Sequence, residues 1–285
     1  MADSINIQLL DRYVAPTDAD IRAGKNYVLT RETTANALAS IVDSLLADAA
    51  ERIVRLCYLH NIDPLTFTIS SAYDAKLFSE IALVLDDLED EMLDLMLEYS
   101  MKCADDEKRR HLLLPWILAL GAKGNNLKSI LDNRLWMFSR DLEAMVVAAR
   151  LAKFNESKAI SLIRSYLHTV YDMPGMRAAF SKSQGIQATY IRSKGVKHGN
   201  VGSSNSESNN IDRMVKVTVQ KAWMKNLIED YKEDGAIGYM CFRGSNFDCP
   251  ICDSICYVFH DISEGMVLPV HSHCQCYAIP IYSKY

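Results

Sequence analysis

The sequence predicts a mostly α-helical protein, in which a multi-helical body is followed by a small, cysteine-rich α+β module. Glycine accounts for only 12 of the 285 residues, while leucine, alanine and methionine are abundant, and this balance favours helix. Several long stretches repeat apolar residues with the period of an amphipathic helix. The last 45 residues differ, because short β-type runs alternate with turn residues there and six of the eight cysteines lie among them.

The composition excludes several classes of protein. Hydrophobic residues make up 49% and charged residues 24% of the chain, which is typical of a folded globular protein and not of a disordered or collagen-like one. The formal net charge is −5, whereas a protein that binds duplex DNA usually carries an excess of basic residues. No stretch of about 18 apolar residues predicts a membrane span, and the start MADSINIQLLDRY lacks the apolar run of a secretory signal. We therefore expect a reducing compartment and no membrane partner.

Two long helices are predicted in the first part of the body. Residues 33–60 carry apolar side chains at helical spacing, and the stretch 61–69 with Pro64 ends this helix. A second helix is expected over residues 72–103, and the face opposite its apolar stripe is strongly acidic. No Glu-x-x-His motif accompanies these carboxylates, so we interpret them as a solvated or partner-facing surface rather than a metal site. The acidic residues are Asp86, Asp87, Glu89, Asp90, Glu91, Asp94 and Glu98.

The rest of the body is predicted to contain helices over 111–120, 127–152 and 157–171, the last with Asn155 as its N-cap. Residues 176–198 are mixed and mildly basic. Neither a glycine-rich phosphate loop nor interleaved aromatic residues accompany these charges, which favours an exposed surface over a nucleic-acid contact.

A low-complexity stretch, GNVGSSNSESNN at residues 199–210, is predicted as a flexible linker or loop. It separates the predicted helical body, residues 1–198, from the C-terminal module, residues 211–285. The module is expected to open with a helix over 211–234. Its predicted strands are 238–242, 256–259 and 276–281.

The cysteines fall into two groups. Cys57 and Cys103 lie singly among leucines and methionines, as small buried hydrophobic residues do. In the module, Cys249 and Cys252 form a C-x-x-C pair with a proline inside it. This spacing lets both thiolates face one cation at about 2.3 Å.

The second half of the motif follows after 18 residues, as HSHCQC at 271–276. His271 and Cys274 are three residues apart, which a tight turn allows, and Cys274 and Cys276 share a face if the chain is extended. Either pair completes a tetrahedral Cys₃His or Cys₄ set. We predict a zinc ion bound by Cys249, Cys252, His271 and Cys274, with Cys276 as the alternative fourth ligand.

Other interpretations of these cysteines stay open. A redox-active C-x-x-C of the thioredoxin type needs a βαβ setting that the sequence does not predict, and disulfides need an oxidising compartment. His260 and His273 are expected at the surface or beside the ligands. Cys241 and Cys256 are expected in strands that pack into the small core.

The predicted zinc is structural. Four protein ligands leave no open position for water, and neither H-E-x-x-H nor H-x-E with P-C-x-x-C occurs in the sequence. No residue is therefore assigned a catalytic or cofactor-binding role, and no small-molecule substrate is expected. A module of this size buries little apolar surface, so the metal is expected to supply folding free energy.

The module resembles the phage Mu F-like minor head proteins, also called the phage head morphogenesis family. The family pattern is a helix, a glycine-bearing strand, an aspartate ahead of C-P-x-C, a spacer and H-P-N-C-R-C. Here the pattern is matched by residues 211–235, by AIGYMCFRGSNFDCPIC at 236–252 and by HSHCQC at 271–276. Pro269 and the pair Val258-Phe259 also fit. Ser272, His273 and Gln275 replace the usual proline, asparagine and arginine.

The resemblance implies a component of the virion or procapsid interior, made in the bacterial cytoplasm and present in few copies near the portal. Its implied partners are portal and capsid proteins, with phage DNA as a further one, in capsid assembly, DNA packaging or DNA delivery. A zinc-dependent nucleic-acid-binding module or regulator is the alternative, and a basic face on residues 176–198 and 238–285 would favour it. We expect no enzymatic activity, because no Ser/His/Asp set, phosphate loop or pair of catalytic acids is identified.

Overall fold

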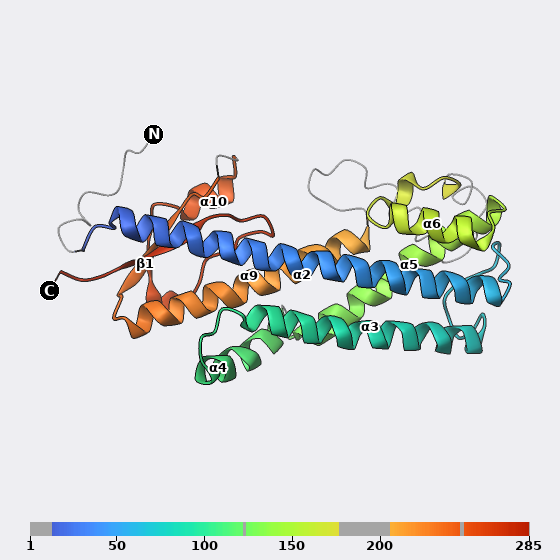
Figure 1. The fold of residues 1–285 in the computed structure, drawn as a ribbon, viewed down its shortest axis with the longest axis horizontal. Helices are drawn as coiled ribbons and strands as arrows, with labels where there is room; N and C mark the ends of the chain where they lie inside the picture. Colours follow the sequence, from blue (N-terminus) through green and yellow to red (C-terminus); the bar gives the residue numbers. More distant parts are fainter. Residues whose placement is uncertain (1–12, 122–123, 177–205, 246–247, 285) are drawn as a thin grey trace. The chain divides into compact units, whose positions relative to one another are not determined.

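A computed structural model describes residues 13–121, 124–176, 206–245 and 248–284 (Figure 1). The chain divides into two compact units. The cysteine unit comprises residues 1–39, 96–120 and 214–285, and the helical unit comprises residues 40–95 and 121–213. Both units are discontinuous in sequence, unlike the predicted division into 1–198 and 211–285, because three long helices each contribute residues to both.

The described part of the chain is mostly helical, as predicted. Local signals fix several helix starts: the Asn155 side chain accepts a hydrogen bond of 2.9 Å from the Lys158 N–H, which confirms the predicted N-cap. Asn126 and Ser129 form a reciprocal capping box at the start of another helix. The helices are α2 (Asp18–Leu59), α3 (Ala75–Met101), α4 (Glu107–Leu118), α5 (Leu127–Leu151), α6 (Glu156–Tyr166) and α9 (Glu207–Glu233).

Some helix boundaries differ from the prediction. Helix α2 begins at Asp18 rather than near residue 33, because Thr17 and Asp20 exchange hydrogen bonds and cap it. The helix predicted over 157–171 ends at Tyr166, and a short 3₁₀ turn, Val170–Asp172, follows. Helix α9 begins at Glu207, inside the predicted linker 199–210. Residues 199–205 of that linker and the mildly basic stretch from residue 177 onward lie outside the described residues.

The acidic face predicted on α3 is exposed, except for Glu89, which is half-buried. Its charges are lightly paired: Asp87 lies 3.1 Å from Arg52, and Asp90 lies 3.6 Å from Lys128. Exposed pairs of this kind contribute about 0–1 kcal/mol each. The face is therefore a solvated negative surface, as the sequence indicated.

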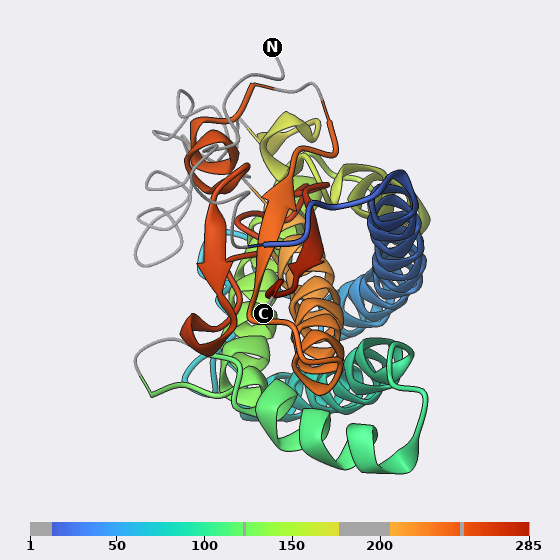
Figure 2. The ribbon, with the colours of Figure 1, turned by 90° about the vertical axis from the view of Figure 1, so that its left-hand side faces the viewer.

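The cysteine unit contains a three-stranded antiparallel sheet with the order β2-β1-β3 (Figure 2). Strand β1 is Gly238–Phe242, β2 is Phe259–Asp261 and β3 is Tyr277–Ile281. The first and third strands were predicted closely, but the run 256–259 is mostly not a strand. Helix α10 (Pro250–Ile255) precedes it, and Tyr257 has a positive φ of 62°, which breaks the extended backbone.

Two helices pack on this sheet within the cysteine unit. Met224 and Ile228 of α9 belong to the same buried cluster as Tyr239 of β1. The first turns of α2 approach β3 so closely that a Cβ at Gly24 would lie 2.8 Å from the Tyr277 ring. The segments that join its strands, which include α10, carry Cys249, Cys252, Cys256, Cys274 and Cys276.

Among the described residues, we find no helix with the length and apolar character needed to cross a membrane.

Candidate metal centre

The first half of the predicted site is built by α10. Cys249 is the N-cap residue of this helix, Pro250 occupies its first turn and Cys252 lies one turn along. The Asp253 N–H donates to the Cys249 carbonyl at 3.0 Å, which fixes the turn. Hydrogen bonding from the Cys252 backbone N–H lowers the pKa of the Cys249 thiol. The proline and the helical turn therefore place both sulfur atoms on one side and favour the thiolate at Cys249.

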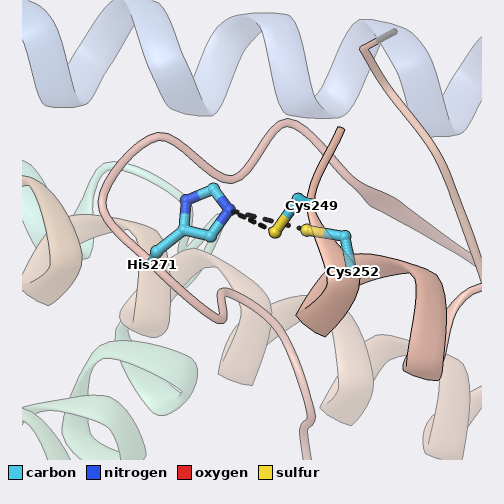
Figure 3. A group of neighbouring side chains, drawn as sticks. All are labelled: Cys249, Cys252 and His271. Atoms are coloured by element: carbon cyan, nitrogen blue, oxygen red, sulfur yellow. Dashed lines mark hydrogen bonds between the residues drawn. The ribbon is translucent and has the colours of Figure 1, made fainter. Parts of the chain in front are cut away.

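The second half comes from the turn that begins at His271. Its Nε2 atom lies 3.5 Å from the Sγ of Cys249 and 3.5 Å from the Sγ of Cys252 (Figure 3). Ligands at the usual Zn–S and Zn–N distances, subtending a tetrahedral angle, lie about 3.5 Å apart. Both nitrogen–sulfur separations therefore already match those of a zinc tetrahedron, and the three ligand atoms all lie within 4.8 Å of one another.

Metal binding at Nε2 of His271 would require a change at the other ring nitrogen, Nδ1. The His273 backbone N–H donates to Nδ1 of His271 at 3.3 Å. A metal ion at Nε2 would place the ring proton on Nδ1, so this long contact would have to open. The imidazole otherwise needs little rearrangement, because its Nε2 already points at both sulfurs.

Both candidates for the fourth ligand lie in a second group. The Sγ atoms of Cys252, Cys274 and Cys276 lie within 4.8 Å of one another, and all three residues are buried. The structure thus brings all five predicted ligands around Cys252, which belongs to both groups. It does not select between Cys274 and Cys276.

Burial and neighbouring thiols act against the charged state of these sulfurs. Burial raises the pKa of the Cys252 thiol, with the Cys249 and Cys274 thiols adding to the effect. The Cys276 thiol raises the pKa of Cys274, and burial adds to it. A divalent cation reverses this balance, because a coordinating thiol is deprotonated by the metal. The fit to a thiophilic metal is therefore good: soft donors, short spacing and a buried setting.

Two side chains that the sequence did not single out hold the His271 turn. Arg31 on α2 is fully buried, and its Nη2 donates to the Cys274 carbonyl at 2.6 Å. Gln220 on α9 donates to the Ser272 carbonyl at 3.0 Å and also contacts Glu32. No local sequence pattern predicts the role of Arg31 or Gln220, because their contacts join segments that are far apart in sequence.

A close backbone approach supports the other side of the same turn. A Cβ at Gly244 would lie 1.7 Å from the Gln275 carbonyl oxygen, so only glycine fits there. Next to it, Arg243 donates to the Cys249 carbonyl at 3.1 Å and to Asp253 at 2.7 Å. The loop after β1 thus contacts both halves of the motif.

The other histidines and cysteines of the module lie outside these two groups. His260 Nε2 contacts the Ile255 carbonyl at 2.8 Å, and its ring stacks on Tyr239, while His273 is exposed. Cys241 is buried in β1 as expected. Cys256 is buried too, but it follows α10 instead of lying in a strand, and its Sγ is 3.7 Å from that of Cys276.

All eight cysteines are free thiols in the structure. Comparisons of this chain with protein-family models, with curated proteins and with solved structures found no match.

Proposed function

We propose that this chain is a structural minor head protein of a bacteriophage, acting near the portal in capsid assembly or in DNA packaging and delivery. The observation that supports the proposal most is the convergence of the two motif halves. Cys249 and Cys252 meet His271 across 18 intervening residues, at distances suited to a shared ion. The resemblance rests on a helix and a strand followed by C-P-x-C and H-x-x-C-x-C. The two cysteine motifs are separate in sequence but lie together in the fold.

The proposed metal is zinc, and its proposed role is structural. Thiolate and imidazole donors suit zinc, and four protein ligands close its coordination sphere. An ion held by α10 and by the His271 turn would join the segment before β2 to the segment before β3. Such an ion would supply folding free energy to loops that contain little regular structure.

The acidic face of α3 is the proposed contact surface for a basic partner in the particle. Asp86, Asp87, Asp90 and Asp94 are exposed on one helix and carry like charge. Closely spaced negative charges favour association with a positive surface and steer its approach.

A basic face on residues 176–198 and 238–285 would favour a nucleic-acid-binding module, and the second of these stretches lacks one. Residues 238–285 carry two basic side chains, Arg243 and Lys284, against four acidic ones, whereas residues 177–198 are mildly basic and lie outside the described residues. A phosphate-binding surface needs the opposite balance. The acidic residues are Asp248, Asp253, Asp261 and Glu264.

Sedimentation of an induced lysate on a density gradient, followed with an antibody to this chain, tests the proposal. We expect the chain to sediment with heads or procapsids, at a few copies per particle. Recovery only as free protein at the top of the gradient would overturn the proposed role.

A second arm tests the contact surface. Reversing Asp86, Asp87, Asp90 and Asp94 to lysine is expected to reduce incorporation into particles. A matched control reverses four exposed acids outside α3 and is expected to leave incorporation unchanged. The control residues are Asp18, Asp105, Glu107 and Asp234. Equal incorporation of the two variants would remove the acidic face from the proposal.

A further inference from the structure

The cysteine unit contains more converging donors than one tetrahedral ion uses. Six cysteines and His271 lie between residues 241 and 276, and five of the six cysteines are buried in one cluster. A single structural zinc takes four ligands. The geometry of the remaining thiols shows what they can do.

Cys252 is the point that the two groups share. It lies with Cys249 and His271 on one side and with Cys274 and Cys276 on the other, and within each group the ligand atoms are at most 4.8 Å apart. A thiolate sulfur has lone pairs for two metal ions. A residue shared by two groups of this size is therefore suited to bridge two ions.

The second group also has a fourth donor within reach. The Sγ atoms of Cys256 and Cys276 are 3.7 Å apart. Two sulfurs bound to one zinc at the usual distance lie about 3.8 Å apart at the tetrahedral angle. Cys256 and Cys276 thus have the sulfur separation of two ligands of one ion, while Cys256 lies outside the group of three thiols that are all within 4.8 Å of one another.

We propose that the cluster binds two zinc ions, with Cys252 and Cys274 as bridging thiolates. The first ion takes Cys249, Cys252, His271 and Cys274. The second takes Cys252, Cys256, Cys274 and Cys276. Six side chains then fill eight ligand positions, and the choice between Cys274 and Cys276 disappears because both are ligands. This inference rests on the proposed structural zinc and extends it by a second ion.

The charge of the cluster is compatible with a second ion. Five thiolates and two divalent ions leave a net charge of −1, which equals the charge of three thiolates and one ion in a Cys₃His site, so the second ion adds no net buried charge. Fully buried Arg31 supplies a positive charge that is anchored to the Cys274 carbonyl. Its Nη2 and Nε are hydrogen-bonded, the latter to Glu32, while its buried Nη1 has no partner among the described residues. Arg31 is thus suited to offset the residual charge.

Native mass spectrometry of the full chain, purified from cells grown with zinc and kept reduced, counts the ions directly. We expect two zinc ions per chain. One ion per chain would overturn this inference and leave the proposed structural zinc standing. A chain without bound zinc would overturn both.

Two matched variants locate the second ion. Cys256→Ser is expected to lower the count from two ions to one, because it removes a ligand of the second site alone. Cys241→Ser alters a buried cysteine of the same core that belongs to neither set, and it is expected to keep two ions. Two ions in Cys256→Ser, or the loss of an ion in Cys241→Ser only, would overturn the assignment of Cys256.

Cadmium replacement gives a readout that needs no variant. The wild-type chain loaded with ¹¹³Cd is expected to show two resonances, with the tetrathiolate ion at higher shift than the ion that has one nitrogen ligand. A single resonance would overturn the two-ion cluster. So would a Cys256–Cys276 disulfide in the chain isolated with its native metal content, detected as the loss of two hydrogen atoms.

Discussion

The helical unit and the cysteine unit differ in the residue types that they bury. In the helical unit, α2, α3 and α5 bury rows of aliphatic and aromatic side chains, and Leu46, Ile81 and Phe138 are among the fully buried ones. The cysteine unit also contains long segments of α2 and α9, but its short strands and loops surround a buried cluster of which half is cysteine. Long amphipathic helices bury enough apolar surface to hold themselves, whereas a small sheet with long connections does not. We therefore expect the helical unit to depend on packing alone, and the sheet and loops of the cysteine unit to depend also on the proposed metal.

Removal of the metal is expected to have the largest effect and to separate the two units. A strong chelator should unfold residues 238–284, because the cross-links between α10 and the His271 turn are lost. The helical unit should keep its structure. Limited proteolysis with mass-spectrometric mapping measures this, with new cleavage sites expected in the module and none in residues 40–95.

Adding zinc back is the control for that experiment, and it should restore resistance to the protease. If the module resisted cleavage equally well with and without chelator, the dependence on metal would be refuted.

The helical unit has its own buried electrostatic network, which gives the next largest effect. Glu143 is 1% exposed and accepts hydrogen bonds from the Ile69 N–H at 2.7 Å, from Thr68 and from Arg140. Glu143→Gln removes the negative charge facing buried Arg140, and we expect a loss of about 3–5 kcal/mol in the free energy of unfolding. Chemical denaturation followed by circular dichroism measures it.

An exposed ion pair provides the matched control for Glu143. Glu156 pairs with Arg55 at 2.7 Å at the surface, and Glu156→Gln should cost about 0–1 kcal/mol. Similar losses in the two variants would show that burial is not what makes the Glu143 network important.

A smaller effect is expected from the residue that positions the metal site. Arg31→Met removes the donor to the Cys274 carbonyl, so the turn that carries three ligands loses its anchor. We expect zinc affinity to fall about 10–100-fold, the usual cost of losing a group that supports metal ligands. Competition with a chromophoric chelator measures the affinity.

Arg22→Met serves as the control for Arg31, because Arg22 lies on the same helix and is exposed. Its zinc affinity should equal that of the wild type. An Arg31→Met chain with unchanged affinity would mean that the turn holds its shape without the guanidinium.

The smallest expected effect is a pH dependence in the helical unit. His60 lies between two carboxylates, with Nε2 2.7 Å from Glu80 and Nδ1 3.1 Å from Asp74. Burial disfavours its charged form, but the hydrogen bonds to Glu80 and Asp74 outweigh that effect and raise the pKa of His60 above its ordinary value. The raised pKa means that this interaction stabilises the fold fully below the ordinary histidine pKa of about 6.5, and that the gain is lost as pH rises through the folded-state pKa.

His60→Gln tests the sign of this dependence. The difference in unfolding free energy between wild type and variant should shrink as the pH is raised from about 6 to about 9. Urea denaturation at a series of pH values measures it. A difference that grew with pH would contradict the assignment of a protonated imidazole.

Local chemistry explains the parts of the fold that were predictable. Helix α5 was predicted over 127–152 and spans Leu127–Leu151, because its periodic apolar residues and its cap are near in sequence. The start of α2 was missed although a capping signal, Thr17 followed by Asp20, was present. The strand predicted at 256–259 failed because its β-type composition does not reveal the positive φ at Tyr257.

The sequence by itself determined the helical class of this protein and indicated five candidate ligand residues, since periodicity, caps and the C-x-x-C and H-x-x-C-x-C spacings are local properties. Only the tertiary structure decided that Cys252 lies in both donor groups, that Cys256 approaches Cys276 and that Arg31 reaches the Cys274 carbonyl. Those contacts join α2, α10 and the end of the chain. Their partners are set by how the helices and the sheet pack, and packing between distant segments leaves no periodic trace in the sequence.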